Sequence, residues 1–200
     1  MLYDYHKYFL NYLTFISTGN TGALVAGATL ILRKLKGVKA ACIGALLPLK
    51  NPILLVDSGA NVEPDAKSMH QFAVMGEIYA RKMLSLEKPR VALINNGTEH
   101  TKGNTLVRET YEILSQDKEI NFVGNIEGRD IFDGDTDVVV CDGFAGNMIL
   151  KTAEGIGMFV LGEVKKMFLS SLKNKLAALL VKSSVSDVKK SFDYAETGGA

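Results

Sequence analysis

Short apolar runs alternate along this chain with longer segments in which apolar residues recur every three or four positions. The short runs are rich in the aliphatic and β-branched residues that favour strands, and turn-forming residues bound most of them. They predict strands within residues 12–16, 39–47, 52–59, 90–97, 120–125 and 137–143. The proline-containing break at 48–52 separates the second run from the third.

The longer segments have helical periodicity. They predict helices at residues 21–37, 65–86, 104–116 and from near 146 towards 190. Gly37 follows three basic residues, a pattern typical of a helix C-terminus. Asn104 has a side chain that can accept a hydrogen bond as the N-cap of the helix that follows it. Serine pairs at 170–171 and 183–184 are expected to break the last helical stretch.

Strands separated by helices are typical of βαβ units, so the chain is predicted to form an α/β fold around a mainly parallel sheet. Such sheets bind ligands at the carboxyl ends of their strands. Five loops are predicted there, all rich in Gly and small polar residues: STGNTG, VDSGAN, NNGTEHTKGN, VGN and CDGFAGN. Each loop taken alone is better explained as an ordinary strand–helix turn. Together they favour an anion site, because Gly permits close approach and helix N-termini offer free N–H groups.

The first loop, from Gly19 to Gly22, has the form of a phosphate-sized cradle at the start of a helix. The small polar residues of these loops are the candidate substrate-binding residues: Gly19, Asn20, Thr21, Gly22, Asp57, Gly59, Asn61, Gly103, Asn104, Asp142, Gly143 and Gly146. Lys102 either neutralises an oxyanion or a phosphate, or is a solvated surface lysine. Asn147 either points an amide N–H at a developing oxyanion or caps the following helix.

Three other loop residues have reactive or ligating side chains. Asp57 either organises loop amides or binds a cation; the first is favoured because no second carboxylate stands at metal-ligand spacing, so no metal is expected. His100 is the apparent general-base candidate, although an exposed imidazole without a catalytic role is favoured for it. Cys141 has no neighbouring cation in sequence to lower its thiol pKa, which disfavours an acyl-cysteine.

Composition excludes some classes of protein. The 200 residues are 47% hydrophobic, enough for a sizeable core, and the formal net charge of +1 gives no sign of a nucleic-acid partner. Cys42 and Cys141 lie in apolar runs and are interpreted as buried and reduced, which fits a cytosolic protein. Residues 8–32 carry no charge, but the polar residues 17–22 in their middle argue against a membrane-spanning helix.

Several segments are specific enough to carry a family resemblance. They are STGNTGALVAG, LLVDSGANVEPDA, QFAVMGEIYA, KGN, INFVGNIEGRDIFDGDTDVVVCDGFAGNMILKTAEG and DYAETGGA. In this order they resemble the bacterial phosphate acyltransferase family, the fatty acid/phospholipid synthesis proteins of the PlsX type. The resemblance runs from Ser17 to Ala200 and is densest from Ile120 to Gly155.

The resemblance implies a Rossmann-like three-layer αβα sandwich of the isocitrate/isopropylmalate dehydrogenase type, here with a C-terminal helical hairpin. It implies transfer of a long-chain acyl group from acyl carrier protein to inorganic phosphate, without a cofactor. The product, acyl phosphate, feeds phospholipid synthesis. It also implies a cytoplasmic homodimer with peripheral membrane contact, and it assigns activity to the lysine of KGN and the asparagine of DGFxGN, here Lys102 and Asn147.

The chain departs from the family pattern at both ends. Relatives have an Asp-Ala-Met-Gly-Gly segment before the first match and a His-Gly-Ser segment after the last. An atypical segment, residues 1–16, thus precedes an incomplete acyltransferase-like domain, residues 17–200. One alternative is an inactive remnant or a scaffold that binds acyl carrier protein or membrane. A second is a short-chain phosphate acyltransferase of the same fold, whereas a dehydrogenase is disfavoured because G-x-G-x-x-G spacing is absent.

Residues 165–190 are unusually basic. They hold seven lysines against one aspartate, and leucines recur among them at helical spacing. A basic amphipathic segment of this kind either lies on an anionic membrane or packs its leucines against a second subunit. The two combine if dimer packing buries the leucines and the helix tips face the membrane.

Overall fold

The computed structural model describes residues 21–47, 49 and 51–181. The chain divides into two compact units, residues 1–33 and 34–200. The predicted strand at 12–16 and the predicted break at 183–184 lie outside the described residues.

The first unit shows one short helical segment. Helix α2 (Thr21–Gly27) continues into a π-helical turn, η1 (Ala28–Leu32). The prediction of a helix over 21–37 is therefore wrong at its C-terminal end. Arg33 has a φ of 63°, which no continuing helix accommodates, and Gly37, with a φ of 93°, forms a separate turn.

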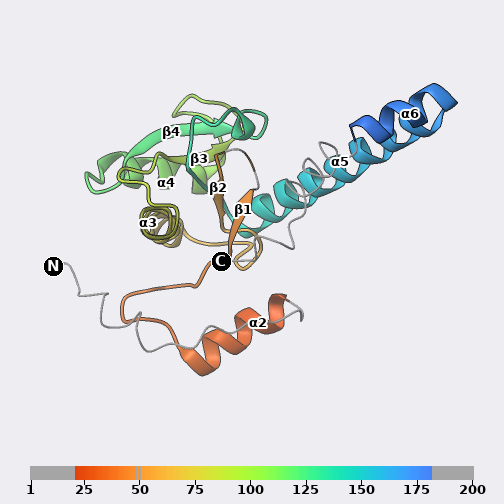
Figure 1. The fold of residues 1–200 in the computed structure, drawn as a ribbon. Helices are drawn as coiled ribbons and strands as arrows, with labels where there is room; N and C mark the ends of the chain where they lie inside the picture. Colours follow the sequence, from red (N-terminus) through yellow and green to blue (C-terminus); the bar gives the residue numbers. More distant parts are fainter. Residues whose placement is uncertain (1–20, 48, 50, 182–200) are drawn as a thin grey trace. The chain divides into compact units, whose positions relative to one another are not determined.

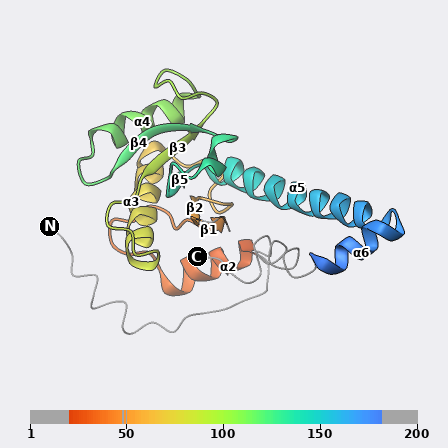
Figure 2. The ribbon, with the colours of Figure 1, turned by 45° about the horizontal axis from the view of Figure 1, so that its top comes forward.

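The second unit is built on a five-stranded sheet in the order β1-β2-β5-β3-β4 (Figure 2). The strands are β1 (Gly44–Leu47), β2 (Ile53–Val56), β3 (Val91–Asn95), β4 (Phe122–Glu127) and β5 (Val138–Val140). Only β1 pairs antiparallel, with β2, and every other pairing in this sheet is parallel. The prediction of a mainly parallel α/β sheet is confirmed.

One predicted loop is instead part of a strand. Gly124 and Asn125 lie inside β4, where they pair with Ala92 and Leu93 of β3. The ladder shifts register beside Val91, and Gly124 takes a φ of 101° that glycine tolerates without strain. The VGN sequence therefore does not end a strand.

Side-chain caps fix where the helices of this unit begin. They are α3 (Ala66–Met83), α4 (Thr105–Gln116), α5 (Gly143–Leu169) and α6 (Leu172–Leu180), with a 3-10 turn, η2 (Asp130–Asp133). Asn104 accepts a hydrogen bond from the Val107 N–H at 2.9 Å, which confirms it as the N-cap of α4. The carboxylate of Asp142 caps α5 in the same way, so this helix begins at Gly143 and not near Gly146 as predicted.

Strand alternation divides the core into two layers. Leu54 and Val56 of β2 pack on one face of the sheet in a cluster with residues of α3 and α4, including Phe72. Ile53 and Leu55 pack on the other face in a cluster with Leu150 of α5 and Ile131 of η2. Helices thus cover both faces, as the predicted three-layer sandwich requires (Figure 1).

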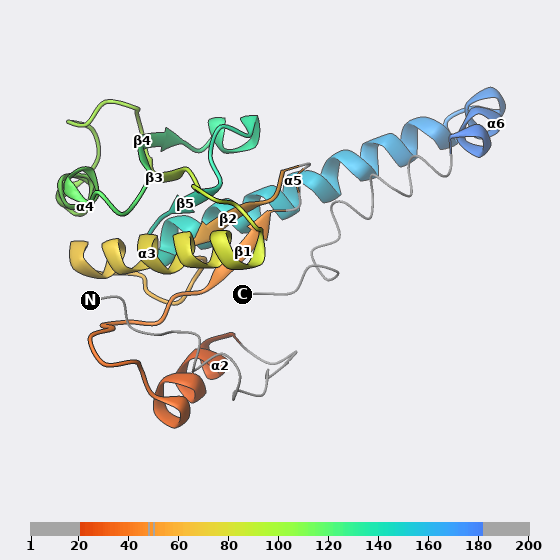
Figure 3. The same cartoon turned by 60° about the vertical axis from the view of Figure 1, so that its left-hand side comes forward.

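The two C-terminal helices extend past the sheet (Figure 3). The predicted break at Ser170-Ser171 is confirmed, because the Ser171 hydroxyl caps α6 by accepting from the Asn174 N–H at 3.1 Å. The leucines of α6 are largely exposed; Leu172 is 77% and Leu180 is 86% exposed. None of the helices within the described ranges combines the length and apolar run that crossing a membrane requires.

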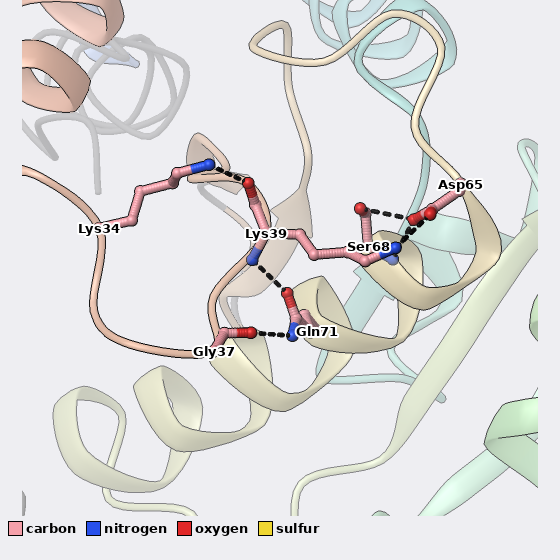
Figure 4. A network of polar contacts seen from close by, with 6 residues as sticks. All are labelled: Lys34, Gly37, Lys39, Asp65, Ser68 and Gln71. Atoms are coloured by element: carbon pink, nitrogen blue, oxygen red, sulfur yellow. Dashed lines mark hydrogen bonds and ion pairs between the residues drawn. The ribbon is translucent and has the colours of Figure 1, made fainter.

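A polar network joins the segment before β1 to α3 (Figure 4). The Gln71 side chain accepts from the Lys39 N–H at 2.8 Å and donates to the Gly37 carbonyl at 2.8 Å. The Lys39 ammonium pairs with Asp65, the N-cap of α3, and with the Ser68 donors holds the pKa of that carboxyl well below its usual range. This network fixes the path of the chain towards Ala41 and Ile43, which contact the site described next.

Candidate active site

Three loops meet at the carboxyl edge of the sheet, because β2, β5 and β3 are parallel neighbours. They are residues 57–61, 141–143 and 95–104. The Asp57 N–H donates to the Cys141 carbonyl at 3.0 Å, and the Gly143 N–H donates to the Asn61 carbonyl at 2.7 Å. The loops after β2 and β5 therefore form one hydrogen-bonded unit.

The carboxylate of Asp57 organises this unit from a fully buried position. Its Oδ1 accepts from the backbone N–H groups of Ile43, Gly59 and Ala60 at 3.0–3.1 Å. Its Oδ2 accepts from the backbone and side-chain amides of Asn61 at 2.7 and 2.8 Å. Both oxygens are directed at N–H donors, so the geometry follows the structural interpretation of Asp57 and leaves no lone pair directed at a cation. Within the described ranges, no cluster of three potential metal ligands occurs.

The glycines at the start of α5 permit close packing against the same loop. A Cβ on Gly146 would lie 1.9 Å from the Asp57 carbonyl oxygen and 2.8 Å from the Cys141 sulfur. A Cβ on Gly143 would lie 2.8 Å from the backbone of Asn61. Packing within the protein therefore explains why both positions are glycine. The Gly143 N–H is not free to bind a ligand, because it donates to the Asn61 carbonyl.

A groove of about 320 Å³ lies where the loop after β3 faces the start of α5. Its lining residues are Ile94, Asn95, Asn96, Gly103, Asn104, Val107, Asp142 and Ala145. The candidates Gly103, Asn104 and Asp142 thus come together as predicted for loops at one sheet edge. Asn95 and Asn96 were not predicted as site residues. Their position directly at the end of β3 is the signal that would have found them.

Asn95 also shapes the loop that carries the candidate lysine. Its side-chain amide donates to the Lys102 carbonyl at 3.2 Å, and its Oδ1 accepts from the Asn96 N–H at 2.8 Å. Gly103 follows with a φ of 89°, in contact range of Asn95, where a Cβ would lie 2.6 Å from its Oδ1. A larger residue at 103 would therefore disturb the path of the chain at Lys102.

The two candidate catalytic side chains are exposed. In the part of the chain that the structure describes, neither the Lys102 ammonium nor the Asn147 amide has a hydrogen-bond or ion-pair partner. Asn147 does not cap α5, since Asp142 does, so that alternative is excluded. Asn147 lies beside the loop after β2, 3.8 Å from the position of a Cβ on Gly59. Both side chains are available to a ligand at this edge, although neither lines the 320 Å³ groove.

The cysteines lack thiolate character. Cys141 is buried, as predicted, and its Sγ donates to the Asp57 carbonyl at 3.2 Å. Burial, with the carboxylates of Asp142 and Asp57 nearby, raises the pKa of this thiol well above its usual value. Cys42 is only partly buried, contrary to prediction, yet desolvation raises the pKa of its thiol to about 12. Neither thiol is suited to carry an acyl group at neutral pH.

Two candidates are less well placed in the structure. His100 is exposed on the loop after β3, with its ring 6.3 Å from that of Tyr111, and no carboxylate orients it among the described residues. Of the predicted anion cradle, Gly19 and Asn20 lie outside the described residues. Helix α2 does begin at Thr21, and Gly22 is exposed. The cradle stays a prediction.

The α/β fold of this chain is shared with solved phosphotransacetylase structures. EutD phosphotransacetylase from Staphylococcus aureus matches 70% of this chain over 48% of its own, with a TM-score of 0.55 and 22% identity. A phosphotransacetylase from Streptococcus pyogenes matches 70% of this chain over 49% of its own, with a TM-score of 0.55 and 20% identity. Identities this low show the shared fold.

Sequence comparison shows the family. The family model described as "Fatty acid synthesis protein" matches residues 11–200, so the chain belongs to that family. It is 47% identical over 188 residues to the phosphate acyltransferase of Caldanaerobacter subterraneus subsp. tengcongensis, matching 93% of this chain and 56% of the relative. It is 43% identical over 187 residues to that of Clostridioides difficile, matching 92% of this chain and 55% of the relative. The chain thus spans about half the length of these relatives.

Proposed function

We propose that this chain forms part of an enzyme that transfers a long-chain acyl group from acyl carrier protein to inorganic phosphate. The observation that carries the proposal is a pair of exposed side chains at the carboxyl edge of the sheet, where parallel sheets bind ligands. Lys102 lies on the loop after β3 and Asn147 lies near the start of α5, each without a partner among the described residues. The names of the family and of its phosphate acyltransferase members support the acyl and phosphate substrates.

In the proposed reaction, an oxygen of phosphate attacks the thioester carbonyl carbon. The C–O bond forms, the carbonyl oxygen becomes an oxyanion, and collapse of this intermediate expels the thiolate of the carrier, which takes up a proton. Lys102 would supply positive charge and Asn147 an N–H to the oxyanion. Helix α5 carries Asn147, and the start of this helix packs against the loop around Asp57. Holding phosphate beside the thioester lowers the remaining barrier through proximity.

Lys102→Ala and Asn147→Ala are each expected to lower turnover roughly 100-fold, because one oxyanion donor contributes about 3 kcal/mol. The measurement is phosphate-dependent formation of acyl phosphate from palmitoyl acyl carrier protein. It is made with this chain and with a longer chain that includes the flanking segments of its relatives. Melting temperatures should stay within a degree or two of wild type, because both side chains are exposed.

Lys88→Ala provides the matched control for lost charge, since Lys88 is exposed and lies between α3 and β3, away from the candidate loops. Its rate should equal that of wild type. A wild-type rate in Lys102→Ala or Asn147→Ala would remove that residue from the site. If neither chain forms acyl phosphate from palmitoyl or acetyl donors, the inactive scaffold becomes the better interpretation.

The proposal extends to α5 and α6, for which we propose subunit pairing along the leucines and contact with anionic lipid through the lysines. The exposed leucines of α6 support the first part. The exposed Lys173 and Lys175, on a helix without acidic residues, support the second. In this arrangement the leucines pack against the second subunit, and the ammonium groups of Lys173 and Lys175 lie among the lipid headgroups.

The double variant Lys173→Glu/Lys175→Glu is expected to weaken binding to anionic vesicles about 30-fold or more, because each basic residue near the surface contributes about 1 kcal/mol. Cosedimentation with phosphatidylserine-containing vesicles measures it. Lys88→Glu/Lys118→Glu makes the same charge change outside these helices and should affect binding far less. If neither Lys173→Glu/Lys175→Glu nor added salt changes the affinity for anionic vesicles, the membrane contact is ruled out and α6 serves subunit pairing only.

A further inference from the structure

A second, larger cavity lies on the face of the sheet opposite α3 and α4. It has a volume of about 610 Å³ and is bounded by the end of β1, the turn η2 and one side of α5. Apolar side chains provide most of its wall: Leu47, Phe132, Met148, Ile149, Ile156 and Val160. No part of the reaction described above uses it.

The cavity adjoins the candidate site through α5. Met148 and Ile149, which line the cavity, directly follow Asn147 on this helix. Ile156 and Val160 continue the lining along the helix, two and three turns on. A ligand whose reactive end lies near Asn147 therefore has an apolar space extending from that point.

The charged residues of the lining are already neutralised. Arg129 pairs with Glu127 at 3.3 Å and with Asp130 at 3.2 Å. Glu154 pairs with Lys151 at 2.8 Å. The cavity thus presents no free charge to a polar ligand, and its walls favour hydrocarbon.

Its size separates a long chain from a short one. An apolar cavity of about 150 Å³ in another protein binds benzene, with six carbon atoms. About four times that volume has room for on the order of twenty carbons. An acetyl group would leave most of the space empty, so the cavity suits the long-chain class of donor.

We infer that this cavity holds the hydrocarbon chain of the acyl donor, with the thioester carbonyl at the Asn147 end of α5. The inference rests on the proposed function and adds to it the place of the chain and the residues that limit its length. Each methylene moved from water into the cavity raises affinity about fourfold. Gly128 and Ala153, both in the lining, are positions where a larger side chain takes up that space.

Two cavity-filling variants test this, Gly128→Leu and Ala153→Leu. A Cβ on Gly128 meets nothing within 4 Å, so the first substitution causes no clash at that atom. Gly155→Leu is the matched control, since Gly155 lies two residues from Ala153 on the exposed side of α5, outside the lining, and its Cβ also meets nothing within 4 Å. The probe is the fluorescent fatty acid cis-parinaric acid, with palmitate and acetate as competitors. Melting curves establish that each variant is folded.

The wild-type protein should bind the probe, and palmitate but not acetate should displace it. Both filling variants should lower affinity at least tenfold, and Gly155→Leu should leave it unchanged. Equal affinity in all four proteins, or no binding by wild type, would overturn the inference. So would filling variants that change the subunit count in sedimentation while leaving probe affinity intact, because the cavity would then be a subunit contact. Probe binding does not require turnover, so failure of the reaction and failure of this inference are distinguishable.

Discussion

Gly146→Ala is expected to destabilise the protein by at least about 3 kcal/mol, a drop of roughly 10 °C in melting temperature. The added methyl would lie 1.9 Å from the Asp57 carbonyl oxygen. It would also lie 2.8 Å from the Cys141 sulfur, so a small shift of the methyl group does not remove the overlap. The obstacle is backbone at the end of a buried strand, so α5 has to move away from the sheet. Chemical and thermal denaturation both measure the loss.

Gly155→Ala is the control on the same helix. Its Cβ meets nothing within 4 Å, and the position is exposed. Alanine is the better helix former, so this variant should gain about 1 kcal/mol. If Gly146→Ala is as stable as wild type, the close contact between α5 and the loop after β2 is not present in solution.

Asp57→Ala is expected to cost about 4 kcal/mol, because it leaves the N–H groups of Ile43, Gly59, Ala60 and Asn61 without their acceptor in a buried site. Asp57→Asn should cost less, about 2 kcal/mol. Its remaining oxygen can still accept from three of these donors, but its amide group would face the donors of Asn61. Urea denaturation of both variants measures the difference.

The control for Asp57 is Asp133→Ala, which removes an exposed carboxylate without a partner among the described residues. Its stability should match wild type within about 0.5 kcal/mol. Equal stability of Asp57→Ala and Asp133→Ala would contradict the role of Asp57 as the organiser of the loop.

The sequence predicts the elements of the core well, because their signals are local. Periodicity places α3 within three residues of its observed bounds, and the Asn104 cap locates the start of α4. One error arises where a distant contact decides, because the ladder with β3 extends β4 through Gly124 and Asn125. Another is local, because the first helix ends early at Arg33, whose φ is 63°.

The sequence predicts which loops form the candidate site, but it predicts less well which of their residues contact one another or line the groove. Parallel-sheet topology brings the loops after β2, β3 and β5 together, as expected. It does not reveal that Gly146 faces the backbone of Asp57, since these residues are far apart in sequence. Nor does loop composition show that Asn95 and Asn96 line the groove beside Asn104. Such details depend on side-chain direction, which pattern alone leaves open.

The length of α5 has an electrostatic consequence. Its 27 residues place the loops at its first turn and the lysines beyond its last turn about 40 Å apart along the axis. The Debye length at physiological ionic strength is about 8 Å, so the potential of an anionic surface decays through several such lengths over that distance. A bilayer that attracts Lys173 and Lys175 would therefore barely repel phosphate at the sheet edge. The helix would let one polypeptide hold a negatively charged surface and a negatively charged substrate without competition between them.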